Sequence, residues 1–377
     1  MRRTVAVTLF IVMGIVWSAP TFARDQWPKE RAAAWGEKTP WLVGSNYVPQ
    51  SAINQLEMWQ ADTFDAETID RELGWAKGLG FNSLRVFLHD IPWRTDRDGY
   101  FERIDRFLDI CKKHDIGVMF VLFDSVWDPE PKAGKQPAPR PHVHNSGWVQ
   151  GPGRAILEDP ARHDELKGYV IDIVGRYRND PRVQVWDLVN EPDNPNTNSY
   201  GPKGKNTEMP PEKKQQMAYL LVEKAFAWAR EAEPSQPLTV GVWGGFVEAD
   251  AKPIPVFTLA LEESDVISFH NYRPLENMKR SVERMKQYGR PVLCTEYMAR
   301  PVGSTFDPIL GYLKQENVGA YNWGFVSGKS QTIYAWETWQ KPSAGEPELW
   351  FHDIFRPGGT PYIPAEVQYI RQVTGAK

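Results

Sequence analysis

The sequence predicts an α/β fold, a (β/α)8 TIM barrel with long loops at the carboxyl ends of its strands. Two observations predict it. From about residue 40, short apolar runs of strand length alternate with longer segments of helical periodicity, and eight such runs occur. The 377 residues, 41% hydrophobic and 24% charged, are also sufficient for a large core. Eight strands alternating with helices are typical of this barrel.

The strand candidates are short apolar runs, many of them rich in β-branched and aromatic residues. They are 41–47, 82–88, 117–123, 183–189, 237–243, 265–270, 291–296 and 319–325. Helices are expected between them, at 65–80, 100–114, 162–178, 211–232, 276–288 and 305–316. The first helix candidate begins at a capping Asp65 and ends at Gly80. The second places Phe101, Ile104, Phe107, Leu108 and Cys111 on one face.

The N-terminus has the pattern of a secretory signal peptide over residues 1–23. Arg2 and Arg3 precede an apolar run, and small residues end at Ala23, which predicts cleavage before Arg24. An uncleaved membrane anchor is the alternative, although the apolar run is short for a membrane span. We therefore expect residues 24–377 to form a single catalytic barrel domain, with 24–40 as a lead-in. This domain would be periplasmic or extracellular, and free of the membrane after cleavage.

Composition excludes some partners. The formal charge of −4 is small and no basic stripe occurs, so nucleic acid is not an expected partner. The two cysteines, Cys111 and Cys294, do not form a disulfide framework and are expected in the core. The oligomeric state is left open.

Three long loops are expected at the carboxyl ends of the strands, at 124–160, 192–210 and 326–360. Loops of this length are usually functional. The last contains Trp336, Trp339 and Trp350, and the chain has 16 tryptophans in all. Because the flat face of tryptophan stacks on sugar rings, the loops predict a cleft with aromatic walls.

Two glutamates close strands that face each other across the barrel mouth. Glu191 ends the fourth strand in VWDLVNEPDN, and Glu296 ends the seventh in RPVLCTEYMAR. A charged carboxylate at the end of a buried strand is costly unless it is used. Two facing carboxylates are the minimum equipment for cleaving a glycosidic bond, one as acid and the other as nucleophile or base.

The segments around these glutamates resemble a known family. WDLVNEP is similar to the strand-four signature of clan A glycoside hydrolases, and LCTEY resembles their strand-seven signature. The nearest match is the cellulase-like glycoside hydrolase family five, over roughly residues 40–330. The resemblance implies a retaining β-glycoside hydrolase acting on a β-linked poly- or oligosaccharide. Glu191 would be the general acid/base and Glu296 the nucleophile, with no cofactor.

The resemblance extends to residues that would support the two glutamates. Arg85 in SLRVFL resembles the arginine that hydrogen-bonds the nucleophile, and His270 and Tyr272 in SFHNY resemble a strand-six pair. Trp323 in YNWGF resembles the tryptophan that floors the subsite where cleavage occurs, and Asn190 the asparagine that binds the sugar 2-hydroxyl. These residues are expected to bind the substrate or to support the glutamates.

The sequence departs from the family at strand three, which often ends in a histidine. FVLFDSVWD offers Asp124 instead, and His142, His144 and Trp148 follow in the loop as candidates for sugar contacts. The departure concerns the substrate and not the type of reaction.

The physical roles of the two glutamates follow from their expected neighbours. Glu296 must be ionised to attack, and Arg85 and the Tyr272 hydroxyl would favour its charged form. Glu191 must be protonated at the start, and the nearby Glu296 charge would disfavour its ionisation.

Other functions remain as alternatives. A transglycosylase would use the same residues with a sugar as acceptor. A non-catalytic carbohydrate-binding barrel would be expected to lack one glutamate. A metal-dependent deacetylase or lyase would need a ligand cluster, whereas His142 and His144 have no evident third and fourth ligand, so no metal is expected. Glucan, mannan, xylan and aryl glycosides all remain open as substrates, as does endo or exo action.

Overall fold

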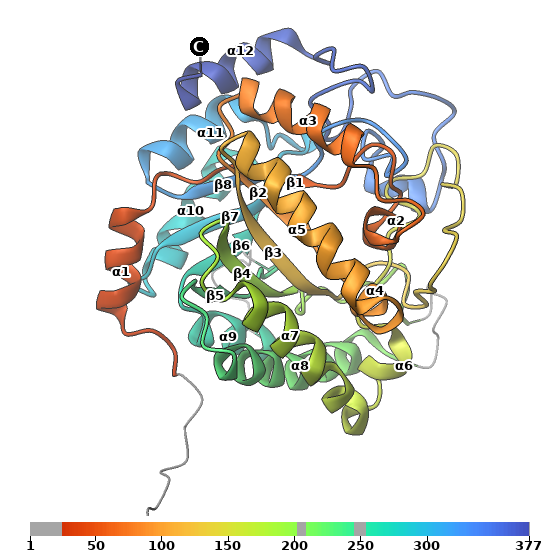
Figure 1. The fold of residues 1–377 in the computed structure, drawn as a ribbon. Coiled ribbons are helices and arrows are strands. Elements are labelled where there is room, and N and C mark those ends of the chain that lie inside the picture. Colours follow the sequence, from red (N-terminus) through yellow and green to blue (C-terminus); the bar gives the residue numbers. More distant parts are fainter. Residues whose placement is uncertain (1–24, 202–208, 245–253, 377) are drawn as a thin grey trace, which may run out of the picture.

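A computed structural model describes residues 25–201, 209–244 and 254–376 of the chain (Figure 1). The signal peptide predicted at 1–23 lies outside the described residues, as does the part of the predicted second long loop at 202–208. No helix within the described ranges is both long and apolar enough to cross a membrane.

Eight parallel strands form one sheet in the order β5-β4-β3-β2-β1-β8-β7-β6. They are β1 (Val43–Tyr47), β2 (Ser83–Phe87), β3 (Gly117–Asp124), β4 (Val183–Asn190), β5 (Leu238–Thr239), β6 (Ile267–His270), β7 (Val292–Tyr297) and β8 (Gly319–Asn322). The two ends of the sheet meet through a parallel bridge between Val242 and Phe269, where the His270 N–H donates to the Val242 carbonyl at 2.9 Å. The sheet is therefore a nearly closed barrel, as the sequence predicted.

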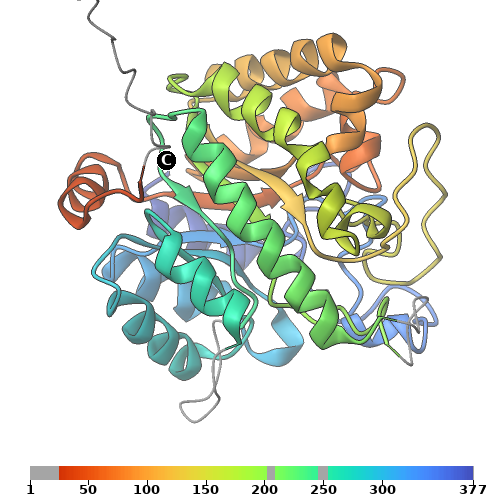
Figure 2. The ribbon, with the colours of Figure 1, turned by 90° about the horizontal axis from the view of Figure 1, so that it is seen from below.

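The helices form an outer ring around the sheet (Figures 1 and 2). They are α1 (Lys29–Lys38), α2 (Gln55–Trp59), α3 (Ala66–Gly78), α4 (Asp90–Thr95), α5 (Arg97–Lys113), α6 (Arg154–Leu157), α7 (Lys167–Tyr177), α8 (Pro211–Glu231), α9 (Pro255–Glu263), α10 (Leu275–Lys286), α11 (Phe306–Gln315) and α12 (Pro364–Thr374). Three short 3-10 helices complete the described elements: η1 (Pro160–Leu166), η2 (Arg300–Val302) and η3 (Trp336–Trp339).

Several element boundaries differ from the prediction. The predicted lead-in contains α1, and α9 and α12 were not predicted. The fifth strand, predicted at 237–243, is only two residues long. After it, the Gly241 N–H donates to the side chain of Asp187 at 3.1 Å, and the Gly241 carbonyl accepts from the Glu191 N–H at 2.8 Å. The eighth strand, predicted to reach residue 325, ends at Asn322, whose side-chain amide donates to the Gly324 carbonyl at 2.6 Å.

The barrel interior changes from apolar to polar along the strands. Along β2, Leu84 and Val86 join the main core beneath the helices, whereas Arg85 and Phe87 contact the site. An apolar interior cluster is formed by Leu42, Met119, Val185, Val266, Leu293 and Tyr321. Strands β1 and β2 approach closely, since a Cβ on Gly44 would meet the Ser83 carbonyl oxygen at 1.6 Å. This packed base supports a polar group of side chains at the carboxyl ends of the strands.

The two cysteines are where the sequence predicted them. Cys111 lies in α5 and Cys294 in β7, both are buried, and both are free thiols.

Candidate active site

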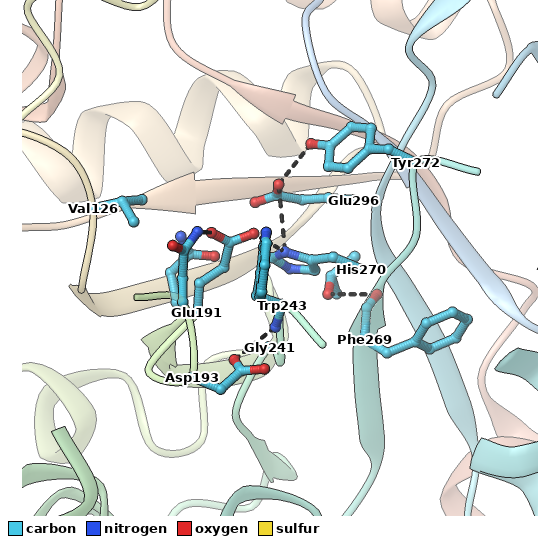
Figure 3. Close-up of polar contacts among 12 residues, drawn as sticks. Val126, Glu191, Asp193, Gly241, Trp243, Phe269, His270, Tyr272 and Glu296 are labelled. Carbon is cyan, nitrogen blue, oxygen red and sulfur yellow. Dashed lines mark hydrogen bonds and ion pairs between the residues drawn. The ribbon is translucent and has the colours of Figure 1, made fainter. Parts of the chain in front are cut away.

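The two predicted glutamates face each other at the barrel mouth. Glu191 directly follows β4 and Glu296 lies in β7, and both are almost fully buried. His270, at the end of β6, lies between them: its Nδ1 is 2.7 Å from Glu191 Oε1 and 3.4 Å from Glu296 Oε2 (Figure 3). One oxygen of each carboxylate and one His270 nitrogen all lie within 4.8 Å of one another. The site therefore holds two carboxylates at close range, joined by one imidazole.

His270 is neutral in this arrangement, since burial lowers the pKa of its imidazole to about 4. A neutral ring carries one N–H, and because Nδ1 faces both carboxylates we assign the proton to Nδ1. His270 then donates to Glu191 and orients that carboxyl group toward Glu296.

Arg85 lies beneath Glu296 and is completely buried. Its Nη1 donates to Glu296 Oε1 at 2.9 Å and to Asn46 Oδ1 at 2.8 Å. Its Nε and Nη2 donate to Asp187 Oδ2 at 3.0 and 2.8 Å, and Nη2 also donates to Asn190 Oδ1 at 2.7 Å. Arg85 therefore lies where the sequence predicted it, and it is fixed by carboxylates on two sides.

The other oxygen of Glu296 is held by tyrosine. The Tyr272 hydroxyl donates to Glu296 Oε2 at 2.7 Å (Figure 3). Burial raises the pKa of Glu296 to about 7, while the charge of Arg85 and the Tyr272 hydrogen bond oppose that rise. The two partners fix both carboxylate oxygens of Glu296 and favour its ionised form.

Glu191 has a different environment. Burial raises the pKa of its carboxyl to about 7, and the Asn194 side-chain amide donates to Oε2 at 2.7 Å. Its backbone is left-handed, with a φ of 47°, which is uncommon for a residue other than glycine. The turn is held from below, where Ser125 Oγ donates to the Glu191 carbonyl and the buried Lys214 ammonium donates to Ser125 Oγ at 2.8 Å.

Asp124 contributes to the site indirectly. It is buried, with 1% exposure, and lies behind the cavity wall: Asn190 Nδ2 donates to Oδ1 at 2.9 Å and Trp148 Nε1 to Oδ2 at 2.6 Å. Both oxygens of Asp124 accept from neighbouring side chains, which is consistent with a supporting position for this predicted site residue. Asp124 orients Asn190 and Trp148, both of which line the cavity.

A cavity of about 320 Å³ opens above the two glutamates. The predicted residues Asn190, Glu191, Tyr272, Glu296 and Trp323 line it together with His144 and Trp148. Trp323 is half-buried, with its ring 5.8 Å from Phe87 and 5.7 Å from Trp148, both edge-on. Trp127, Trp243 and Trp336 also line the cavity, so its walls are aromatic, as the long loops predicted.

The two loop histidines have structural hydrogen bonds. His144 lines the cavity and its Nδ1 lies 2.8 Å from the Tyr334 carbonyl, while His142 Nδ1 lies 2.9 Å from the Ser343 carbonyl. Among the described residues, the cluster with the geometry to hold a metal ion is Glu191, His270 and Glu296 itself. The contacts of His270 Nδ1 with the two carboxylates already explain why these three side chains lie so close together.

Sequence reasoning missed several residues of the site. Asn46 and Asp187 hold Arg85, Asn194 holds Glu191, and Lys214 supports its turn. Polar residues inside the apolar strands VGSNY and VWDLVN were a usable signal for Asn46 and Asp187. No pattern in the sequence indicates that Lys214, in a helix rich in charge, has a buried side chain.

Comparison with known proteins agrees with this geometry. The family model described as cellulase (glycosyl hydrolase family 5) matches residues 46–329. Comparison with curated protein sequences gives no match.

Similar solved structures share the fold at low sequence identity. An endo-β-1,4-mannanase from Thermotoga petrophila has 16% identity and a TM-score of 0.55, with 89% of this chain and 76% of that chain covered. An exo-β-1,4-mannosidase from Opitutaceae bacterium strain TAV5 has 20% identity and a TM-score of 0.58, with 89% and 60% covered. A family 5 mannosidase from Rhizomucor miehei has 15% identity and a TM-score of 0.52, with 90% and 94% covered. With a family model that matches most of its length and a barrel of this architecture, the chain belongs to glycosyl hydrolase family 5 and is a glycosidase.

Proposed function

We propose that this glycosidase retains the anomeric configuration of its β-linked substrate through a double displacement. The observation that carries the proposal is the approach of the two glutamates, whose oxygens come within 4.8 Å of each other. Retaining glycosidases hold their carboxyl groups about 5–5.5 Å apart, whereas inverting enzymes need roughly 6.5–9.5 Å to admit a water molecule. The short approach supports direct attack by one carboxylate.

The neighbours of the glutamates support a different role for each. Glu296, held by Arg85 and Tyr272, attacks the anomeric carbon and forms a glycosyl-enzyme bond. Glu191, which is hydrogen-bonded by Asn194 and His270, gives its proton to the leaving oxygen. In the second half, Glu191 takes a proton from water, which attacks the same carbon and releases Glu296.

The rate should depend on pH with a bell-shaped profile. Activity falls on the acid side as Glu296 becomes protonated and on the alkaline side as Glu191 loses its proton. Burial raises the pKa of both carboxyl groups to about 7, so both limbs lie near neutral pH. The control is Glu191→Gln, assayed in a single turnover with a fluoride glycoside that needs no acid. The pH profile of Glu191→Gln should have no alkaline limb. If the limb persisted, a group other than Glu191 would cause it.

Trp323 is the expected platform for the sugar at the cleavage point. Trp323→Ala should lower kcat/KM by about 10- to 100-fold, because stacking on an aromatic ring contributes roughly 1–3 kcal/mol. The protein should remain folded, because the ring is half-buried and faces the cavity. A large fall in melting temperature with normal activity per folded molecule would instead make Trp323 a core residue.

The substrate is proposed as a β-linked oligo- or polysaccharide. The solved structures named above are a mannanase and mannosidases, which favours β-1,4-linked mannosides as the first substrates to assay. A screen over defined manno-, gluco- and xylo-oligosaccharides and aryl β-glycosides, with product mapping, tests the function. Hydrolysis of at least one series supports it, and no cleavage of any β-glycoside would contradict it.

We also propose that the enzyme is exported. The support is the signal-peptide pattern of residues 1–23. N-terminal sequencing of the exported protein should begin at Arg24, and an intact N-terminus would contradict cleavage.

A further inference from the structure

Asn145 is a buried amide without a hydrogen-bond partner, and it lines the cavity. Its side chain is 1% exposed, and neither Oδ1 nor Nδ2 has a partner among the described residues. Buried polar groups are nearly always hydrogen-bonded, since the loss of water must be compensated. An amide that donates and accepts side by side suits the hydroxyl groups of a sugar.

The backbone of Asn145 is fixed, so the amide is held in place. Its N–H donates to the Ser330 carbonyl at 2.9 Å, and its carbonyl accepts from the Trp148 N–H at 3.2 Å. Its φ of 46° is left-handed, a conformation that asparagine tolerates better than most residues. The backbone that carries this amide is therefore held in place beside the cavity.

Asn145 belongs to the part of the cavity that holds the glycone, the sugar attacked by Glu296. It is bonded to Trp148, whose ring packs against Trp323, the expected platform for that sugar. Glu191 is held by Asn194, and the leaving group must depart toward Glu191 to receive its proton. A sugar stacked on Trp323 therefore lies beside Trp148, and Asn145 lines the same cavity.

Three loops bonded to one another lie next to Asn145 and form what we call the end wall, residues 50–55, 142–149 and 329–343. In Figures 1 and 2 the yellow loop after β3 and the blue segment after β8 lie on the same side of the barrel. Asn54 Nδ2 donates to the Gly147 carbonyl at 2.8 Å, and the Lys329 N–H donates to the Gln50 carbonyl at 3.0 Å. These bonds tie the loop after β1 to both of the longer segments.

The two longer segments also bond directly to each other. The His144 N–H donates to Thr338 Oγ1 at 2.9 Å, and both residues are buried. Above the cavity the rings of Trp127 and Trp339 stack at 5.3 Å and 12°. Hydrogen bonds therefore join all three loops of the end wall. The cavity of about 320 Å³ lies at the small end of the roughly 300–1,000 Å³ usual for ligand sites.

We propose that Asn145 binds the hydroxyl groups of a non-reducing terminal sugar, and that the end wall leaves room for one sugar on the glycone side. The enzyme then removes single sugars from chain ends, an exo action on β-linked oligosaccharides. This inference rests on the proposed function, and it makes Asn145 a determinant of specificity.

The first experiment uses the wild-type protein. The substrates are a nitrophenyl β-glycoside of the sugar selected by the screen, the matching oligosaccharide, and that oligosaccharide methylated on its non-reducing terminal sugar. We expect the enzyme to cleave the nitrophenyl glycoside and to release only monosaccharide from the oligosaccharide. It should not cleave the methylated oligosaccharide. Internal cleavage of the methylated chain beside cleavage of the glycoside would overturn the exo action while leaving the proposed function intact. Failure on every substrate would overturn both.

The second experiment tests Asn145 with Asn145→Gly, because glycine keeps the left-handed backbone and deletes only the amide. The matched control is Asn317→Gly, at an exposed asparagine with a φ of 51° at the other end of the barrel. Asn145→Gly should lower kcat/KM on the nitrophenyl glycoside on the order of tenfold for each hydrogen bond lost, whereas the control should match wild type.

The assay is repeated with analogues that each lack one hydroxyl group of the terminal sugar. Wild type should lose activity on the analogue whose hydroxyl Asn145 binds, and Asn145→Gly should not distinguish that analogue from the parent. The role of Asn145 would be overturned if Asn145→Gly were as active as Asn317→Gly. It would also be overturned if wild type and Asn145→Gly lost the same activity on every analogue. Since the wild-type experiment needs no variant, the exo action stays testable if Asn145→Gly does not fold.

Discussion

Glu296→Ala should abolish turnover of every substrate, by roughly 10⁴- to 10⁶-fold, because no glycosyl-enzyme bond can form without its carboxylate. A good leaving group should not help, since the lost group is the nucleophile and not the acid. Folding should survive, because Arg85 keeps its buried ion pair with Asp187 at 2.8 Å. Activity on nitrophenyl and fluoride glycosides is measured beside a melting curve.

The matched control for this variant is Glu296→Gln, which keeps the size of the side chain and removes only its charge. Both variants should be equally inactive. Added azide can attack the sugar from the face left empty in Glu296→Ala, and any product should be the α-glycosyl azide. Full activity in either variant, or a β-azide, would remove Glu296 from the role of nucleophile.

Glu191→Ala should behave differently, because it loses only proton donation and later proton abstraction. On substrates with poor leaving groups, the rate should fall by about 10²- to 10⁴-fold, the usual contribution of a general acid. A fluoride glycoside needs no acid, so the first step should proceed and the glycosyl-enzyme should accumulate. Rapid-mixing kinetics should show a burst, followed by a stall for lack of a base.

Azide, which needs no base, should restart turnover of Glu191→Ala and give a β-glycosyl azide. The two glutamate variants must therefore differ in the stereochemistry of their azide products and not merely in rate. If Glu191→Ala shows neither a burst nor rescue by azide, another residue is the acid/base.

Much of the barrel was predictable from periodicity. Buried parallel strands such as GVMFVLF in β3 are continuous apolar runs, and the intervening helices have an apolar face, so both signals are strong. The fifth strand was the weakest prediction. After its two residues, the Gly241 backbone in PLTVGVW bonds to Asp187 and Glu191, and these partners are 50 or more residues away in the sequence.

The residues of the site also differ in how far the sequence could predict them. Glu191 and Glu296 follow from their places at strand ends, since those ends converge at one mouth. Arg85, His270 and Tyr272 were expected only from the resemblance to family five.

Asp124, Lys214 and Asn145 could not be assigned from sequence, because what each side chain does depends on partners that only the folded loops supply. The Asp124 carboxylate accepts from Asn190 and Trp148, whereas the side-chain amide of Asn145 has no partner among the described residues, although Asp124 ends β3 and Asn145 lies in the loop that follows it.

The stereochemistry of the first-formed product is the most direct test of the double displacement. The substrate is the β-glycoside that the screen selects, and proton NMR spectra are collected before the released sugar equilibrates between its two anomers. Two displacements at one carbon predict that the β-anomer appears first and the α-anomer only later, at the rate of spontaneous mutarotation. Early appearance of the α-anomer would contradict the account, because it would mean that water attacks the sugar directly and that Glu296 forms no bond to it.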